Sequence, residues 1–240
     1  MIRGLYSAAA GLRAGQERFE AISQNLVNAT TPGYRRQVAV TRPFAQLLIH
    51  RLGGNEETGL ASSSYVGRLG TGAMVQELAL DLRAGRPEST GEATHFLIEG
   101  EGYFVTRGES GDSYSRRGDF RLDEAGYLVA ANGDLVVGAD GRPVQAVDGK
   151  VSAGQLLVVQ PDPADLVATG QGRYRLREGA ALPQQVAAGV AIGYLESSNV
   201  DPNQEMTEML TAFRAYEANQ KVIQAMDETL GKAVNEIGRI

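Results

Sequence analysis

Apolar residues recur every seven residues at both ends of the chain. Near the N-terminus the repeat consists of Leu5, Leu12, Phe19 and Leu26, with Ala8, Gly15 and Ile22 at the intervening steps. Near the C-terminus it consists of Met209, Tyr216, Ile223, Leu230 and Ile237. This spacing places the side chains on one face of a helix, and such a face packs against another helix. The pattern predicts helices over residues 3–29 and 202–237 that pair with each other or with other copies of the chain.

Residues flanking these repeats give the helix ends. Pro32 and Gly33 end the first helix, because proline disfavours helix in the residue before it and glycine permits positive φ. Asp201 suits the N-cap of the second helix, and Pro202 suits its first turn.

Glycines interrupt the first helical repeat at Gly11 and Gly15. Each glycine weakens an isolated helix by about 1 kcal/mol relative to alanine. The missing side chains also allow a neighbouring helix to approach closely.

The central region between the helices contains short β-prone runs separated by turn residues. The runs are Phe96–Ile98, Tyr103–Val105, Phe120–Leu122, Tyr127–Val129, Leu135–Val137, Leu156–Val159, Arg173–Leu176 and Val190–Ile192. Pairs such as Asn132-Gly133 and Asp140-Gly141 are typical of tight turns between strands. Short strands at this spacing favour a small sandwich or an irregular barrel.

The segment between residues 35 and 90 is less regular. Phe44–Ile49 suits a strand or a short helix, Gly53–Ser64 is predicted to be a mobile loop, and Val75–Leu82 is predicted to be a strand. The whole pattern predicts an α+β fold with long N- and C-terminal α-helices packed as a coiled-coil-like core domain. We assign residues 1–34 and 199–240 to this helical domain and residues 35–198 to a β-rich central domain.

Composition narrows the possible classes of function. The net charge is −6 without a long basic run, which argues against nucleic-acid binding. The chain has no cysteine, so disulfides and thiolate metal sites are excluded. We find no apolar run long enough to span a membrane and no secretory leader pattern, so export without a cleaved leader is compatible with the sequence.

Candidate catalytic chemistry is weak. The only histidines, His50 and His95, lie on different segments, and neither a nucleophile elbow nor a phosphate-binding glycine loop occurs. Carboxylates such as Asp119, Asp123 and Glu124 lie beside turn glycines, where they serve turns and surface. The sequence predicts a protein that is not an enzyme and has no cofactor or metal.

Other interpretations of the two amphipathic helices stay open at this point. Such helices often cover the core of their own domain, and an intramolecular helix pair carrying a ligand-binding β module is compatible with the pattern. A carbohydrate-binding or wall-cleaving β protein on a helical stalk is a second alternative, which requires two opposed carboxylates or a metal.

Several motifs resemble those of the flagellar basal-body rod and hook protein family. The segment Ser23–Tyr34 resembles the family signature S-x-N-L-A-N-x-x-T-x-G-[FY], with Val27 in place of alanine. Met1–Tyr6 looks like the start of rod members, and Ser198–Val200 with Arg214–Asn219 looks like the C-terminal motif. In between, Leu69–Gly72, Ile98–Phe104 and Tyr114–Phe120 resemble core landmarks in the same order.

The resemblance implies a structural axial subunit of the rod. It implies that the terminal helices line an export channel, that subunits leave through the flagellar type III export apparatus, and that they polymerise helically in the periplasm. Implied partners are other copies of the chain and other rod and hook-junction proteins. The opening residues and short chain favour a proximal FlgF-type subunit, with a distal FlgG-type subunit as the alternative.

The expected assembly residues come from both stripes and from the signature. Asn25 and Asn28 are expected to hydrogen-bond backbone near the helix end. The full set is Leu5, Leu12, Phe19, Ile22, Asn25, Leu26, Asn28, Tyr34, Met209, Phe213, Tyr216, Ile223, Leu230 and Ile237.

Overall fold

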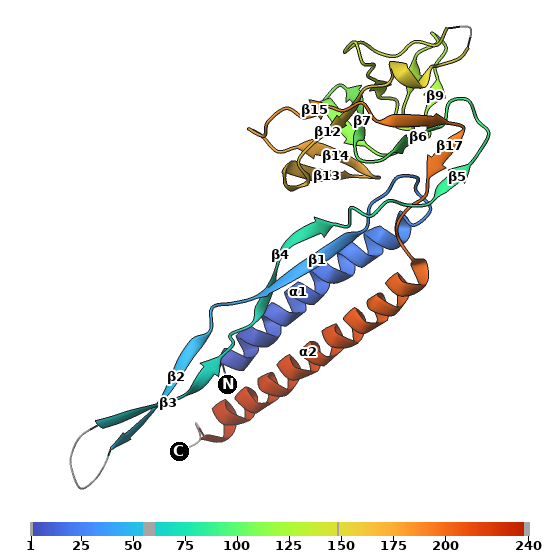
Figure 1. The fold of residues 1–240 in the computed structure, drawn as a ribbon. Coiled ribbons are helices and arrows are strands. Elements are labelled where there is room, and N and C mark those ends of the chain that lie inside the picture. Colours follow the sequence, from blue (N-terminus) through green and yellow to red (C-terminus); the bar gives the residue numbers. More distant parts are fainter. Residues whose placement is uncertain (1, 55–60, 148, 238–240) are drawn as a thin grey trace. The chain divides into compact units, whose positions relative to one another are not determined.

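A computed structural model describes residues 2–54, 61–147 and 149–237 (Figure 1). Its helices are α1 (Ile2–Val27) and α2 (Pro202–Ile237), with short 3-10 turns at Ala153–Gln155 and Pro163–Asp165. The strands before the central region are β1 (Gln37–Pro43), β2 (Leu47–Gly54), β3 (Ala61–Leu69) and β4 (Ala73–Leu80). The later strands are β5 (Pro87–Ser89), β6 (Phe96–Glu99), β7 (Tyr103–Gly108), β8 (Gly111–Ser115), β9 (Arg121–Leu122), β10 (Leu128–Val129), β11 (Leu135–Val136), β12 (Val158–Gln160), β13 (Leu166–Gly170), β14 (Arg173–Leu176), β15 (Gln184–Gln185), β16 (Gly189–Ile192) and β17 (Tyr194–Glu196).

The chain divides into two compact units. The helical unit contains Met1–Gln24, Gln37–Ala79 and Asn203–Ile240, and the β unit contains Asn25–Arg36 and Leu80–Pro202. The α+β class is confirmed. The division differs from the boundaries expected at residues 34/35 and 198/199, because β1–β4 group with the helices and the segment after Gln24 groups with the β unit.

The helical unit places α1 and α2 side by side, running in opposite directions (Figure 1). A side chain at Gly4 would collide with Met226, and one at Gly11 would lie 3.0 Å from the Asn219 amide. These four positions, which we call the glycine row, are spaced by seven residues on both helices. The expected close approach is confirmed at Gly11, where it depends on the absence of a Cβ atom, but not at Gly15, where a Cβ atom would meet nothing within 4 Å.

Two antiparallel ribbons complete the helical unit. One pairs β1 with β4, and the other pairs β2 with β3 from Leu47↔Leu69 to Gly54↔Ala61. The expectation of a loop over Gly53–Ser64 is therefore wrong at both ends, where residues 53–54 and 61–64 form strands. Its centre, residues 55–60, lies outside the described residues. The composition of this segment is Gly/Ser-rich, but cross-strand pairing rather than local propensity decides its structure.

The β unit is built on a nine-stranded antiparallel sheet. Its strand order is β13-β14-β8-β7-β11-β10-β9. In addition, β12 pairs with β7, and β15 pairs with β12. Two short strand pairs, β16-β6 and β17-β5, accompany it. Each β-prone run predicted from the sequence contains a strand. The sequence favoured a sandwich or a barrel, whereas the observed pairing is one branched sheet with two short pairs.

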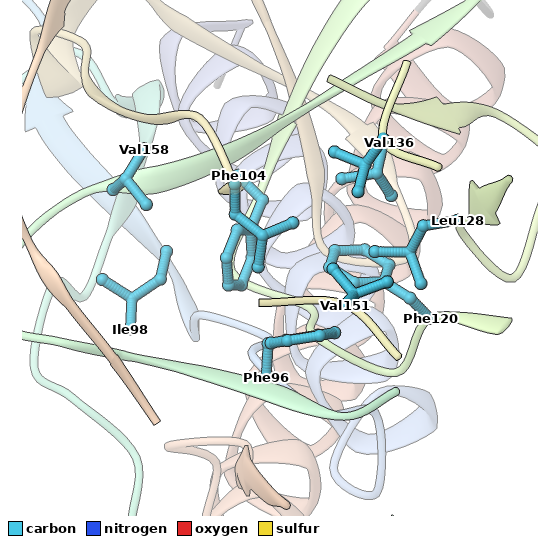
Figure 2. Packing of buried hydrophobic residues seen from close by; sticks show 10 residues of the cluster. Phe96, Ile98, Phe104, Phe120, Leu128, Val136, Val151 and Val158 are labelled. Carbon is cyan, nitrogen blue, oxygen red and sulfur yellow. The ribbon is translucent and has the colours of Figure 1, made fainter. Parts of the chain in front are cut away.

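Successive side chains of β7 point to opposite faces of the sheet and belong to two different hydrophobic clusters. Phe104 points into the first cluster, and its neighbours Tyr103 and Val105 point into the second. In the first cluster the rings of Phe104 and Phe120 meet at a centroid distance of 5.3 Å and an angle of 76°. Figure 2 shows these rings with Phe96 among aliphatic side chains from several strands. The members are Phe96, Ile98, Phe104, Phe120, Leu128, Val136, Val144, Val151, Leu156 and Val158.

Tyrosines dominate the second cluster. Tyr103 and Tyr174 meet edge to face with centroids 5.8 Å apart, and Tyr114 packs beside them. Burial raises the pKa of Tyr103, Tyr114 and Tyr174 above the ordinary phenol value, most strongly for Tyr174. The folded β unit therefore holds these phenol protons more tightly than the unfolded chain does.

Substitution Phe104→Ala is expected to destabilise the β unit by about 3–5 kcal/mol, because it removes a fully buried ring from the first cluster. Urea unfolding followed by near-ultraviolet tyrosine circular dichroism measures this change. Val167→Ala, at a β13 position that is 45% exposed, is the control and is expected to change stability by no more than about 0.5 kcal/mol. Equal effects of both substitutions would contradict the assignment of the core.

The stability of the β unit is expected to fall as pH rises above about 10, the ordinary tyrosine pKa. Below that pH both states keep their phenol protons, whereas above it the unfolded chain releases protons that the folded unit retains. Urea unfolding across this pH range, in parallel with tyrosinate absorbance, measures the loss. Tyr114→Phe is expected to reduce the slope, while Val167→Ala, at an exposed position without a phenol group, leaves it unchanged. A slope independent of Tyr114 would contradict this origin.

Candidate assembly site and linker clamp

The N-terminal stripe lies on α1 with unequal exposure. Ile22 is buried, Leu5, Leu12 and Leu26 are half-buried, and Phe19 is exposed. Gly4 and Gly11 of α1 lie close to side chains of α2. Phe19, at 38% exposure, leaves apolar surface uncovered on the same helix.

The C-terminal stripe lies on α2. Met209, Ile223 and Leu230 are half-buried, whereas Phe213 and Tyr216 are 50% and 38% exposed. Ile237 is the last residue of α2, and its side chain lies outside the described residues.

A groove between the two helices brings part of the predicted set together. Its walls are Gly15, Gln16 and Phe19 of α1 and Ala212, Phe213 and Tyr216 of α2, and its volume is about 320 Å³. Arg18 and Glu208 form an ion pair of 3.7 Å across the same helix pair. The groove offers an apolar surface with three aromatic side chains.

The signature residues Asn25, Asn28 and Tyr34 lie in the β unit. The buried Asn25 accepts a hydrogen bond from the Tyr34 hydroxyl at 3.1 Å through its Oδ1 atom. Asn28 Oδ1 accepts one from the Thr31 hydroxyl at 3.2 Å. These two bonds fold the chain back after α1 through side-chain partners, and a role of either asparagine in assembly stays a prediction.

A buried ion cluster occupies the centre of the β unit. The Glu196 carboxylate lies 2.6 Å from Arg35 Nη1 and accepts a hydrogen bond from Arg116 Nε at 2.9 Å. The side chains of all three residues are at most 4% exposed. Arg116 Nη1 also donates to the carbonyl oxygens of Gly100 and Gly102, at 2.8 Å each. The buried charges are thus satisfied by each other and by backbone.

The same glutamate binds two neighbouring backbones. Its Oε1 atom accepts from the Gly85 amide at 2.8 Å, and its carbonyl oxygen accepts from the Gly33 amide at 2.7 Å. Gly33 has φ of +65°, and a Cβ atom there would lie 2.5 Å from the Arg116 carbonyl carbon. The positive φ expected at Gly33 is confirmed, and the close approach to Arg116 adds a second reason for glycine.

Asn199 continues this network three residues later. Its Oδ1 atom accepts from the Arg36 amide at 2.7 Å, and its Nδ2 atom donates to the carbonyl oxygens of Asp81 and Arg83 at 2.9 Å each. Arg83 in turn holds the Asp81 carboxylate and lowers its pKa through side-chain hydrogen bonds. We call Arg35, Arg116, Glu196 and Asn199 together the linker clamp.

A cavity of about 500 Å³ lies beside the linker clamp. Its polar lining consists of Arg35, Glu101, Tyr103, Arg116, Gln160 and Glu196, and apolar and glycine residues complete it. The Glu101 carboxylate accepts a hydrogen bond from Gln160 Nε2 at 2.6 Å. The described part of the chain contains no cluster of metal-ligating side chains.

Sequence reasoning placed none of the clamp residues in the candidate site. Arg116 and Asn199 were noted only inside family-like motifs, and Arg35 and Glu196 carried no signal of their own. Arg116 and Glu196 are 80 residues apart in the chain, so local periodicity cannot connect them. Asp123 followed expectation, because its carboxylate accepts from the amides of Ala125 and Tyr127 in a turn.

Comparison with known proteins covers both the β unit and α2. Residues 97–187 match the family described as flagellar hook protein FlgE/F/G D1 domain. Residues 191–236 match the family described as flagellar basal body rod FlgEFG protein C-terminal.

Individual relatives align over nearly the whole chain. The flagellar hook-basal body complex protein FlhO of Bacillus subtilis (strain 168) is 33% identical, with 100% of both chains covered. The flagellar basal-body rod protein FlgG of the same bacterium is 28% identical, covering 98% of this chain and 99% of the relative. The rod protein FlgF of Rhizobium meliloti (strain 1021) is 28% identical, with 99% of both chains covered.

These matches and the helix–β–helix order define the class. The chain belongs to the flagellar basal-body rod protein family, of the FlgF/FlgG type. Among the described residues no helix is long and apolar enough to cross a membrane.

Substitution Glu196→Ala is expected to destabilise the β unit by about 3–5 kcal/mol, because it leaves two buried guanidinium groups without their carboxylate. Urea unfolding measures the loss. Glu178→Ala, at an exposed position after β14, is the matched control. A loss no larger than that of the control would show that the ion cluster contributes nothing to stability.

Proposed function

We propose that this chain is a structural axial subunit of the bacterial flagellar basal-body rod. The proposal rests on one observation: relatives named as basal-body rod proteins align with 98% and 99% of this chain. A polymerising subunit also needs apolar surface that its own fold leaves uncovered. Its function is then mechanical, as part of a shaft that transmits torque and surrounds the export channel.

Exposed apolar side chains in the helical unit support assembly through this unit. Phe19, Phe213 and Tyr216 line the interhelical groove. On the ribbon of β2 and β3, Leu48, Tyr65 and Val66 are 61%, 58% and 62% exposed. Contiguous exposed apolar surface of this kind marks protein–protein contacts. Coiled-coil packing of the heptad stripes between subunits belongs to this proposal.

The proposed partners and location follow the same reasoning. Neighbours are other copies of this chain and other rod and hook-junction proteins, and delivery is through the flagellar type III export apparatus. The location is the periplasmic rod of the basal body. We propose a structural role without catalysis, because the relatives are named as basal-body rod proteins.

Within the rod we propose the proximal FlgF-type position first, from the opening residues and the short chain. The distal FlgG-type position is the alternative. It is favoured by relatives named FlgG, among them one of Caulobacter vibrioides with 30% identity over 95% of this chain.

Deletion of the gene tests this function. Electron microscopy of hook–basal bodies from the deletion strain is expected to show particles that stop at the membrane ring or part-way along the rod. The stopping point separates the proximal from the distal position. Complete particles with a normal rod and hook would reject the rod assignment.

A point substitution tests the proposed assembly surface. Phe213→Asp places a charge in the interhelical groove and is expected to abolish complementation of the deletion strain, because a desolvated unpaired charge opposes association. Gln220→Asp introduces the same charge at an exposed position of the same helix and is expected to complement. Circular dichroism of the purified variants verifies that both remain folded. Normal motility of the Phe213→Asp strain would remove the groove from the interface.

A further inference from the structure

The turn between β10 and β11 contains the dipeptide Asn132-Gly133. Of the asparagines in the chain, Asn132 alone is followed by glycine, and each of the others precedes a residue that carries a side chain. Both residues of the pair are exposed. A Cβ atom at Gly133 would meet nothing within 4 Å, so open space surrounds this glycine. The pair therefore combines a side-chain amide with an unhindered backbone nitrogen directly after it.

These two groups are the reactants of a known rearrangement of the peptide chain, which needs no enzyme because they are held close together. The Gly133 nitrogen bonds to Cγ of Asn132 and gives up its proton. The Cγ–Nδ2 bond breaks, Nδ2 leaves with this proton as ammonia, and a five-membered succinimide ring remains. Water then opens the ring. Attack on the side-chain carbonyl gives aspartate, and attack on the main-chain carbonyl gives isoaspartate.

Two hydrogen bonds of the turn hold the reacting groups in place. The Gly133 amide donates to the Ala130 carbonyl oxygen at 2.9 Å, and Asn132 Nδ2 donates to Asp134 Oδ2 at 2.6 Å. The first bond has to break before the nitrogen reaches Cγ, and the second retains the group that leaves. Opening of the turn therefore controls the rate of the reaction.

The products fit this turn less well than asparagine does. Either product brings a carboxylate next to Asp134 in place of a hydrogen-bond donor, and like charges at this separation repel each other. Isoaspartate also lengthens the main chain by a carbon atom inside a hairpin whose strands pair at Val129↔Leu135. Leu128 and Val136, beside this pair, are buried in the first hydrophobic cluster. A modified turn therefore strains the edge of the core.

We propose that Asn132 is a site of spontaneous deamidation and that the turn between β10 and β11 restrains the reaction in the folded protein. Each modified chain carries an additional negative charge and has a less stable β unit. The inference goes beyond the proposed function and does not rest on it, because deamidation is a property of the isolated chain. The deletion strain tests the rod assignment independently.

Incubation of the purified protein in mildly alkaline buffer tests the site, because base removes the amide proton. Ion-exchange chromatography separates the more acidic chains, and peptide mapping by mass spectrometry locates the modified residue. Residue 132 is expected to be converted first, to a mixture of aspartate and isoaspartate. Asn132→Gln cannot form the five-membered ring and is expected to lose this product. Asn203→Gln, at an exposed asparagine followed by glutamine, is the matched control and is expected to leave the rate unchanged.

Incubation in guanidinium chloride measures the restraint by the turn. The unfolded chain is expected to react about two- to tenfold faster, the factor that corresponds to breaking one hydrogen bond. Equal rates in the folded and unfolded chain would overturn the restraint. First conversion at another asparagine, or an undiminished acidic product in Asn132→Gln, would overturn the site. Asn132→Asp adds the charge without lengthening the main chain, so it is expected to lower the melting temperature less than isoaspartate does.

Discussion

The carboxylate of Glu196 is the group on which the order of the β unit depends. Taking two guanidinium groups and one carboxylate out of water is costly, and the mutual attraction of such charges repays this only when the remaining hydrogen bonds are made. Here the Glu196 carboxylate also accepts from the Gly85 amide, and Arg116 donates to two further carbonyl oxygens. The cluster therefore selects one path for the chain segments around it, because any other path would leave a buried charge without a partner.

Local sequence pattern was sufficient for most of the secondary structure. The seven-residue repeat placed α2 at its observed bounds, and Pro32 and Gly33 marked the region after α1, because these signals act within a few residues. Strands with polar or glycine-rich sequences escaped this reasoning. β8 contains Gly111, Asp112 and Ser113, and it forms because β7 provides the pairing edge. The ends of β2 and β3 at residues 53–54 and 61–64 were predicted to be a loop for the same reason.

The candidate site was less predictable than the fold, because it depends on which surfaces meet. A heptad stripe identifies the apolar face of a helix without identifying its neighbour. In the structure side chains of α2 approach Gly4 and Gly11 closely, and Phe19 lines a groove between the two helices. The linker clamp brings together Arg35, Arg116 and Glu196 from segments far apart in sequence, and only the folded sheet relates them.

The glycine row has a consequence for the folding of the N-terminal helix α1. Glycine lowers the intrinsic helix stability of α1 at Gly4, Gly11 and Gly15, by about 1 kcal/mol each relative to alanine. At two of these positions, Gly4 and Gly11, side chains of α2 fill the space. Packing against α2 has to supply the stability that α1 lacks as an isolated segment. Formation of the α1 helix and its packing against α2 are therefore one cooperative step. The N-terminal segment therefore becomes fully helical only where a second helix is present to receive it.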